Sequence, residues 1–323
     1  MKAITQDRYG SPDVLRLEEV GKPQIGDGQV LVRVRGAGID PGVWHVMTGV
    51  PYLMRIMGLG FRRPRTRVAG TDFAGEVEAV GSDVTRFQPG DEVYGGCRGA
   101  FAELACARAD KIALKPKNLS FEQAAAVPSS ALTALQGLRD KGKLKAGQSA
   151  LIIGAAGGVG SFAVQIAKAL GAEVIGVCST SKVDLVHSLG ADSVIDYTRE
   201  DLDIGGRHYD VILDTAGNRS LSLLRQALTP RGTLVIVGGE EGGRWLSGID
   251  RQLRALLLSP LVRQNLRPML AAFGSDDLTF LKGLIEADRV RPVIDRTFQL
   301  SEAAEAVRHF ERQHARGKIV LTI

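Results

Sequence analysis

The sequence is poor in cysteine and lacks long apolar stretches. Its 323 residues include three cysteines, and this odd number without paired spacing argues against a disulfide framework and fits a reducing compartment. No stretch approaches the roughly 18 consecutive apolar residues that a membrane-spanning helix needs. The first 20 residues are too charged for the apolar core of a signal peptide. We therefore expect a cytoplasmic protein with no membrane partner.

Aromatic residues are also scarce, at 5% of the chain, and they do not alternate with basic residues as base-stacking surfaces require. The formal net charge is +5, and the basic residues are dispersed except in the segment RRPRTR, residues 62–67. We interpret this segment as a solvated loop, with a polyanion site as the alternative. The sequence thus predicts no nucleic-acid partner.

Glycine is abundant, with 39 residues, which is typical of tight turns and of close backbone approach. The chain length favours two domains. Short strands of alternating apolar and polar residues dominate the first part of the chain, as in VLVRVRGAG from Val30. After a helical segment near Phe121, five apolar strands alternate with helices, and we place a sixth at 266–273. This order is typical of βα units in a parallel sheet.

These patterns predict an α/β fold with a doubly wound parallel sheet of the Rossmann type. We expect the parallel sheet and its helices to form one domain, residues 123–288, between the β-rich segments 1–122 and 289–323.

The strongest chemical signal is a glycine-rich turn, GAAGGVG, at residues 154–160. A strand precedes it, and an amphipathic helix and a second strand follow, which is the context of a dinucleotide fingerprint. Ala155 stands at the first glycine position of that fingerprint, and Gly154 relieves the turn. We expect Gly160 to permit close helix packing and the helix start to bind a pyrophosphate. The predicted contacts come from Ala156, Gly157, Gly158, Val159 and Gly160.

The end of the second strand indicates which cofactor binds. Enzymes that prefer NAD usually carry a carboxylate there for the ribose 2′-hydroxyl. Here the chain has Ser179, Thr180 and Lys182, whose hydroxyls and positive charge suit a 2′-phosphate. We therefore predict NADPH as the cofactor. The alternative is that Ser179 caps the helix that begins near Lys182.

Several segments together resemble the medium-chain dehydrogenase/reductase superfamily, in its zinc-free quinone oxidoreductase branch. They are GTDFAGEVEAVGSDVTRFQPGDEVYG (70–95), AAAVPSSALTALQGL (124–138), the glycine-rich segment, LGADSVIDY (189–197) and HARGKIVLTI (314–323). The block from Cys178 to Tyr197 and the final segment look most similar to NADPH oxidoreductases of the reticulon-4-interacting protein 1 type. The resemblance implies a GroES-like catalytic domain, which residues 1–122 form and residues 289–323 complete, with a dinucleotide-binding domain of residues 123–288 inserted into it. It also implies a homodimer and a nicotinamide-dependent oxidoreductase.

The resemblance also implies further cofactor contacts. Tyr197 is expected with Ser179 around the adenosine, and Thr133 near the nicotinamide. The loops after the fourth and fifth strands of the parallel sheet add Thr215 and Gly238, and the last segment adds His314, Ala315 and Arg316. As alternatives, Tyr197 is a core aromatic residue, and His314 and Arg316 are ordinary surface residues.

Zinc-dependent relatives carry an early cysteine, a Gly-His-Glu motif and a further cysteine. This chain has Asp40 at the first position and Gly70-Thr71-Asp72 at the motif. The four-cysteine structural lobe of those relatives is also missing. We therefore expect no metal, and a carbonyl polarised by hydrogen bonds or by the cofactor ribose.

The early motif of close relatives, V-N-P-x-D-W-K, reads Ile39-Asp40-Pro41-Gly42-Val43-Trp44-His45 here. The candidate catalytic residues are Tyr52, His45 and Asp40, with His45 or Tyr52 as proton donor to an enolate. The alternative is that Tyr52 and Trp44 line an apolar pocket and solvent supplies the proton. The predicted reaction is hydride transfer to a quinone or an α,β-unsaturated carbonyl. Its rivals are a zinc-free ketone or aldehyde reductase and a cofactor-binding protein without turnover.

Overall fold

The computed structural model describes residues 1–199, 206–238, 243–246, 248–312 and 316–323. They form two compact units. The first contains residues 1–132, 273–288 and 292–323, and the second contains residues 133–272 and 289–291. The sequence analysis placed 123–132 and 273–288 in the dinucleotide-binding domain. In the structure they belong with the first unit, because their helices pack on its strands.

The first unit is built around a seven-stranded sheet with the order β14-β15-β3-β4-β5-β7, in which β6 also pairs with β3. The long strand β3 carries its apolar residues on alternate positions, so that Val30, Val32 and Val34 are buried while Arg33 and Arg35 face outward. The strands are β1 (Lys2–Thr5), β2 (Arg16–Glu19), β3 (Gln29–Ile39), β4 (Asp72–Val80), β5 (Glu92–Gly96), β6 (Leu104–Arg108), β7 (Ile112–Leu114), β14 (Ile294–Gln299) and β15 (Lys318–Thr322).

The described part of this unit contains five α-helices besides α4 (Pro128–Leu135). Helix α3 begins at a capping box made by Ser120 and Gln123 and packs on β3 and β4, and α10 packs on β7. The helices are α1 (Pro41–Thr48), α2 (Tyr52–Met54), α3 (Phe121–Ala125), α10 (Ser275–Glu286) and α11 (Ala303–Glu311). Helix α4 (Pro128–Leu135) crosses from the first unit into the second.

The second unit is a six-stranded parallel sheet with the order β10-β9-β8-β11-β12-β13. Its central strands are buried along nearly their whole length, as strands covered on both faces must be. The order reverses between β8 and β11, which makes the carboxyl ends of these strands the topological switch point. The strands are β8 (Ser149–Ile153), β9 (Glu173–Cys178), β10 (Ser193–Asp196), β11 (Tyr209–Asp214), β12 (Leu228–Ile236) and β13 (Asn265–Pro268).

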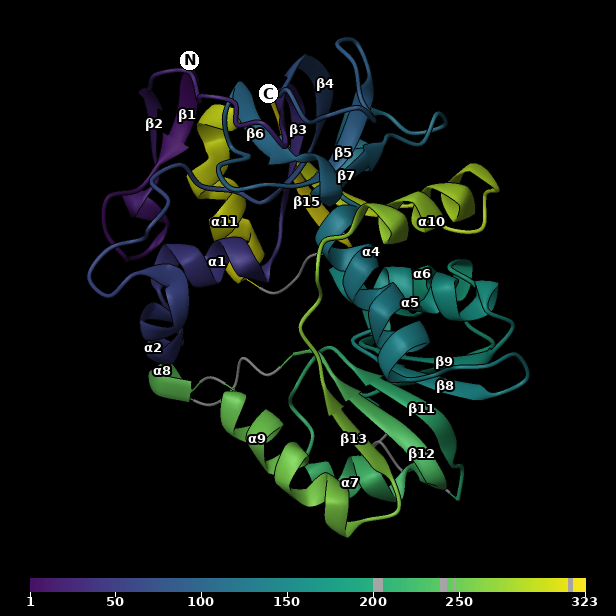
Figure 1. Cartoon of the computed structure of the whole chain (residues 1–323). Coiled ribbons are helices and arrows are strands. Elements are labelled where there is room, and N and C mark those ends of the chain that lie inside the picture. Colours follow the sequence, from purple (N-terminus) through teal and green to yellow (C-terminus); the bar gives the residue numbers. More distant parts are fainter. Residues whose placement is uncertain (200–205, 239–242, 247, 313–315) are drawn as a thin grey trace. The chain divides into compact units, whose positions relative to one another are not determined.

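Helices α5 and α6 pack on β8, β9 and β10, while α7 packs on β12 and α9 on β13 (Figure 1). The helices of this unit are α5 (Gly158–Ala169), α6 (Val183–Ser188), α7 (Leu221–Gln226), α8 (Gly243–Leu246) and α9 (Ile249–Leu258). The predicted α/β fold, a Rossmann sheet with a GroES-like β-rich part, is thus confirmed.

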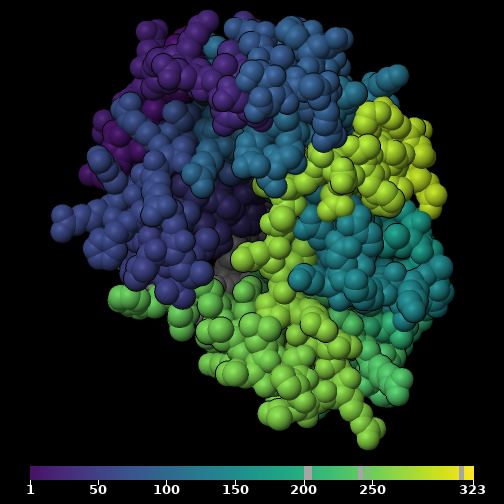
Figure 2. Space-filling model, viewed as in Figure 1, coloured from purple at the N-terminus to yellow at the C-terminus, as the bar shows by residue number. Residues whose placement is uncertain are grey.

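Helix α9 lies at the surface of the second unit (green in Figure 2). Its Ala255 is buried, whereas Leu253, Leu256 and Leu257 are exposed. In the described part of the chain, no helix has the length and apolar character that crossing a membrane requires.

Candidate functional site

The glycine-rich turn connects the end of β8 to the start of α5. Gly154 has φ +82°, in the left-handed region that favours glycine. Gly160 lies so close to the turn that an added Cβ would be 2.0 Å from the carbonyl oxygen of Gly154. Both positions therefore require glycine, and Gly160 brings the first turn of α5 against the end of β8.

The start of α5 is suited to an anion. Gly157 is its N-cap residue and has no side chain to cap the helix, so the first N–H groups of α5 lack intrahelical partners. These groups and the positive end of the helix dipole attract a phosphate. An added Cβ at Gly157 would meet only the Gly154 oxygen, at 3.3 Å, so space remains beside the helix start. The residues present thus fit a dinucleotide pyrophosphate.

Two predicted loop residues lie beside this turn. Thr215 donates a hydrogen bond from Oγ1 to the carbonyl of Ile153 at 2.7 Å. A Cβ added to Gly238 would be 2.3 Å from the carbonyl oxygen of Thr215. The structure therefore brings Gly154, Thr215 and Gly238 together at the carboxyl ends of β8, β11 and β12.

The predicted 2′-phosphate contacts follow β9, where Thr180 and Lys182 form a short 3₁₀ turn with Ser179 as its N-cap residue. The Ser179 side chain makes no capping hydrogen bond, so the alternative role of Ser179 as a side-chain cap is wrong. Thr180 donates its hydroxyl to the carboxylate of Asp196, the last residue of β10, at 2.6 Å. The Thr180 hydroxyl is thus already engaged within the protein.

Asp196 is a residue that the sequence reasoning missed. Its carboxylate also accepts hydrogen bonds from the backbone N–H and the hydroxyl of Thr198. The hydrogen bond from Thr180 is the main cause that lowers the pKa of Asp196. The position of Asp196 at the end of an apolar strand, in VIDY, is the signal that could have found it.

Tyr197 follows β10, and the residue is 49% exposed, so the alternative of a core aromatic residue is wrong. The guanidinium carbon of Arg219 lies 5.9 Å from the centre of this ring. Arg219 Nε is buried and has no hydrogen-bond partner among the described residues. Arg219 was also missed, although it lies in the loop after β11 that was expected to border the cofactor.

A buried ion pair supports the same end of the sheet. Asp214, the last residue of β11, is fully buried and accepts hydrogen bonds from the N–H groups of Ala216 and Gly217. Arg251 of α9 donates to its other oxygen at 2.5 Å. Arg251 therefore attaches α9 to the loop that carries Thr215.

In the first unit, Asp40 is the N-cap residue of α1. Its Oδ1 accepts hydrogen bonds from the N–H groups of Gly42 and Val43, and its Oδ2 accepts one from the Thr71 hydroxyl at 3.1 Å. These bonds fix the start of α1 to the segment before β4. Asp40 thus has an evident structural role, and its catalytic role stays a prediction.

Asp72, next to Thr71, is fully buried. It accepts hydrogen bonds from the backbone N–H and the hydroxyl of Ser129, and Lys318 Nζ lies 3.9 Å from its Oδ2. Burial, and then the charge of Asp40, raise the pKa of Asp72 to about 7, although Lys318 and Ser129 oppose the shift. Lys318 Nζ has no hydrogen-bond partner among the described residues.

The candidate proton donors lie on and after α1. His45 Nδ1 is 2.6 Å from the carbonyl oxygen of Val50. Because a carbonyl only accepts, Nδ1 carries the proton of that bond, and Nε2 can donate only when the ring is doubly protonated. The Tyr52 ring lies 4.5 Å from the guanidinium of Arg55, which also stacks on Tyr9. This stacking holds Tyr52 in place.

The remaining predicted cofactor contacts are spread along the chain. Thr133 lies in α4. Arg316 is exposed, its backbone N–H donates to Asp295, and its guanidinium makes no hydrogen bond or ion pair within the described residues. His314 and Ala315 lie outside the described residues.

Comparisons with known protein families give two matches. Residues 26–117 match the alcohol dehydrogenase GroES-like domain, and residues 189–321 match the zinc-binding dehydrogenase family. A relative from Mus musculus, the mitochondrial NAD(P)H oxidoreductase RTN4IP1, is 34% identical over 100% of this chain and 89% of its own length.

Two further relatives are as similar. The NADPH-dependent alkenal/one oxidoreductase of Arabidopsis thaliana is 34% identical over 99% of this chain and 79% of its own. The quinone oxidoreductase of Pseudomonas aeruginosa is 34% identical over 99% of both chains.

Solved structures agree with these relatives. The quinone oxidoreductase from Coxiella burnetii has a TM-score of 0.85, with 32% identity over 100% of this chain and 99% of its own. The Escherichia coli quinone oxidoreductase complexed with NADPH has a TM-score of 0.82, with 27% identity over 100% of both chains. The chain therefore belongs to the medium-chain dehydrogenase/reductase superfamily and is an oxidoreductase related to its quinone oxidoreductases.

Proposed function

We propose that this protein is a zinc-independent, NADPH-dependent oxidoreductase that transfers hydride to a quinone or an α,β-unsaturated carbonyl. The observation that carries the cofactor assignment is the turn between β8 and α5, with its uncapped helix start and the close packing at Gly160. The names of the Arabidopsis, Pseudomonas and Escherichia relatives support the substrate classes and NADPH.

The protein's part in the reaction is binding and orientation. The N–H groups at the start of α5 bind the pyrophosphate, and the loop residues Thr215 and Gly238 border the cofactor. When bound, NADPH supplies the hydride. Ser179, Lys182 and Arg219 contribute a hydroxyl and two positive charges that favour a 2′-phosphate.

Zinc independence is proposed from donor chemistry. At the positions where zinc-dependent relatives carry a cysteine and a histidine, this chain has Asp40 and Thr71. The two side chains bond to each other, and Asp40 also caps α1. A hydroxyl is not among the usual zinc ligands. We expect elemental analysis of the purified protein to find no stoichiometric zinc; one zinc per chain, with activity lost on chelation, would refute this point.

The function is tested by following NADPH oxidation with a panel of enones, quinones, ketones and aldehydes. Turnover of enones or quinones in preference to saturated ketones supports the proposal. Preference for ketones favours the alternative of a zinc-free carbonyl reductase, which similarity to an NAD-dependent alcohol dehydrogenase structure (28% identity, TM-score 0.83) keeps open. NADPH binding without any turnover would favour the other alternative, a cofactor-binding protein that is not an enzyme.

Cofactor preference has its own test, because it rests on one strand end. Loss of a charged contact to the 2′-phosphate costs roughly 1.5–3 kcal/mol, or about 10- to 100-fold in affinity. NADPH should therefore bind at least that much more tightly than NADH, and Ser179→Asp should reverse the order. Ser181→Asp, an exposed position two residues on, is the matched control. Equal efficiency with NADH in the unmodified protein would contradict the assignment.

The proton donor is tested with His45→Phe and Tyr52→Phe. Loss of a general acid lowers turnover by about 10²-fold or more, whereas loss of a pocket wall changes the Michaelis constant more than turnover. We expect the second outcome for both residues, because His45 Nδ1 and the Tyr52 ring are held by Val50 and Arg55.

The cytoplasmic location and the homodimer stay predictions, which fractionation and sedimentation can test.

A further inference from the structure

The second unit contains a cavity at the end of its parallel sheet opposite to the glycine-rich turn. It has a volume of about 500 Å³, and its lining includes residues at the amino ends of β8, β11, β12 and β13, such as Asp210 and Asn265. The glycine-rich turn lies at the carboxyl ends of these parallel strands. The cavity is therefore separate from the proposed cofactor site.

Four cations line this cavity: Lys141, Lys143, Arg231 and Arg267. All four are exposed, and none of their side chains makes a hydrogen bond or ion pair within the described residues. Of the two carboxylates in the lining, Asp140 is neutralised by two hydrogen bonds from Arg139. Four positive charges thus face one uncompensated negative charge, that of Asp210.

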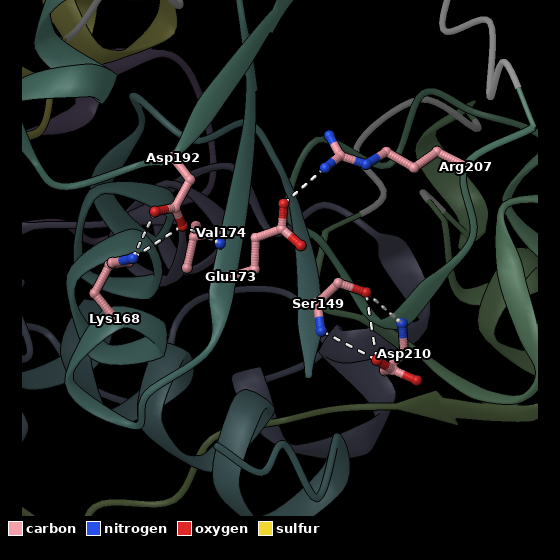
Figure 3. A network of polar contacts seen from close by, with 7 residues as sticks. All are labelled: Ser149, Lys168, Glu173, Val174, Asp192, Arg207 and Asp210. Atoms are coloured by element: carbon pink, nitrogen blue, oxygen red, sulfur yellow. Dashed lines mark hydrogen bonds and ion pairs between the residues drawn. The ribbon is translucent and has the colours of Figure 1, made fainter. Parts of the chain in front are cut away.

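The rest of this sheet edge is organised differently (Figure 3). Arg207 pairs with Glu173 at 2.7 Å, and Lys168 pairs with Asp192 at 2.8 Å. The carboxylate of Asp210 is itself engaged by the backbone N–H and the hydroxyl of Ser149. Cations beside the cavity therefore lack the carboxylate partners that their neighbours have.

The backbone that presents the two lysines is unusual. Residues Gln136–Lys141 form a π-helical turn, a form that is rare and is frequent at functional sites. Lys143 has φ +52°, a left-handed conformation that is costly for a residue with a side chain. An added Cβ at Gly142, between the lysines, would be 2.9 Å from the Leu138 carbonyl oxygen. The loop is thus tightly built where its lysines reach the cavity.

We propose that this cavity binds a small, multiply charged phosphate compound. Two arginines provide the planar donor pairs that phosphate oxygens accept, and two lysines add positive charge. Volumes of about 300–1,000 Å³ are typical of small-molecule sites. The lining residues include no aromatic side chain, and Val211 is the apolar one, so the site favours a compact polyanion over a nucleotide base.

The test is calorimetric titration of pyrophosphate into the full chain with NADPH in excess, so that the glycine-rich turn is occupied. We expect one pyrophosphate per chain. Arg231→Gln/Arg267→Gln should weaken its binding by about 100-fold, because each lost charged contact costs about 10-fold. Lys141→Gln/Lys143→Gln should weaken it also. These side chains are exposed, and circular dichroism checks that the variants fold.

Arg207→Gln is the matched control, because Arg207 lies at the same sheet edge but is paired with Glu173; it should bind pyrophosphate as the unmodified protein does. Citrate, a tricarboxylate, tests whether phosphate is recognised beyond its charge, and it should bind more weakly. The proposal is overturned if pyrophosphate does not bind, if the double variants bind it normally, or if citrate binds equally well. NADPH affinity in these variants is measured separately, so failure of this site is distinguishable from failure of the proposed function.

Discussion

Each unit of the molecule contains a fully buried aspartate opposite a cation, and the two pairs are built differently. In the second unit, Asp214 touches Arg251 at 2.5 Å and also accepts two backbone N–H groups. In the first unit, Asp72 is 3.9 Å from Lys318, and Ser129 provides its hydrogen bonds. Burial raises the pKa of Asp72 to about 7.

The difference shows two ways to keep a carboxyl group inside a protein. Direct contact with a guanidinium offsets the cost of removing a charge from water, but it makes each partner depend on the other. A longer contact leaves part of that cost uncompensated, and the carboxyl group can avoid it by taking up a proton. Loss of one partner from the first kind of pair should lower the free energy of unfolding strongly. The contribution of the second kind of pair should instead depend on pH.

The largest expected effect comes from breaking the tight pair. Arg251→Met leaves Asp214 buried without its cation and should lower the free energy of unfolding by about 3–5 kcal/mol, as measured by denaturant titration. Arg254→Met is the control, since Arg254 is exposed and pairs with Asp250 one helical turn away. That variant should lose less than about 0.5 kcal/mol. Similar losses in both variants would mean that the buried Asp214–Arg251 pair stabilises the fold no more than the exposed Arg254–Asp250 pair does.

The second prediction concerns pH and Asp72. Between about pH 4 and pH 7 the folded protein keeps a proton on Asp72 that the unfolded chain has lost. The contribution of Asp72 to stability is therefore fully present below the unfolded pKa and is lost as pH rises through about 7, by at most about 1.4 kcal/mol per pH unit. Asp72→Asn should flatten this decline when unfolding is measured across that range. Parallel pH profiles for the two proteins would show that Asp72 ionises normally.

A smaller effect is expected from Lys318→Met. Lys318 Nζ has no hydrogen-bond partner among the described residues, and without the lysine Asp72 can bind a proton. The loss at pH 7 should thus be about 1 kcal/mol, well below that of Arg251→Met, and it should shrink at pH 5. A loss of unfolding free energy as large as that of Arg251→Met, and independent of pH, would mean that the Asp72–Lys318 pair behaves as the Asp214–Arg251 pair does.

The smallest effect on stability should come from Asp40→Asn. Asparagine caps a helix about as well as aspartate, so the free energy of unfolding should change by less than about 1 kcal/mol. The charge of Asp40 is the second cause that raises the pKa of Asp72. The pH-dependent decline should therefore move to lower pH in this variant. If the decline occurs at the same pH as in the unmodified protein, the charge of Asp40 does not affect the pKa of Asp72.

The sequence was most informative where a pattern is local. Apolar runs predicted all six strands of the parallel sheet, and the glycine-rich turn was placed between β8 and α5, because neighbouring residues determine both. The long-range contacts were not predictable in this way. That Thr180 donates to Asp196, or that Arg251 reaches Asp214, depends on strand order and on helix packing.

The bounds of the two compact units differ from the predicted domain bounds for the same reason. Helices α3 and α10 read as part of the alternating βα pattern, and only their packing on β3, β4 and β7 assigns them to the first unit. The outcome for Thr180 is similar. Its hydroxyl was expected to donate a hydrogen bond to a phosphate, but it donates to the carboxylate of Asp196.

The pairing of β15 with β3 has a consequence for how the molecule assembles during synthesis. Strand β15 lies between β14 and β3, although about 280 residues separate it from β3 along the chain. A ribosome therefore releases nearly the whole second unit before the first can complete its sheet. The nascent first unit exposes the edge of β3 at Gly36–Ile39 for that time, because β6 pairs only with Gln29–Arg33. A chaperone that protects such an edge would act on the first unit alone.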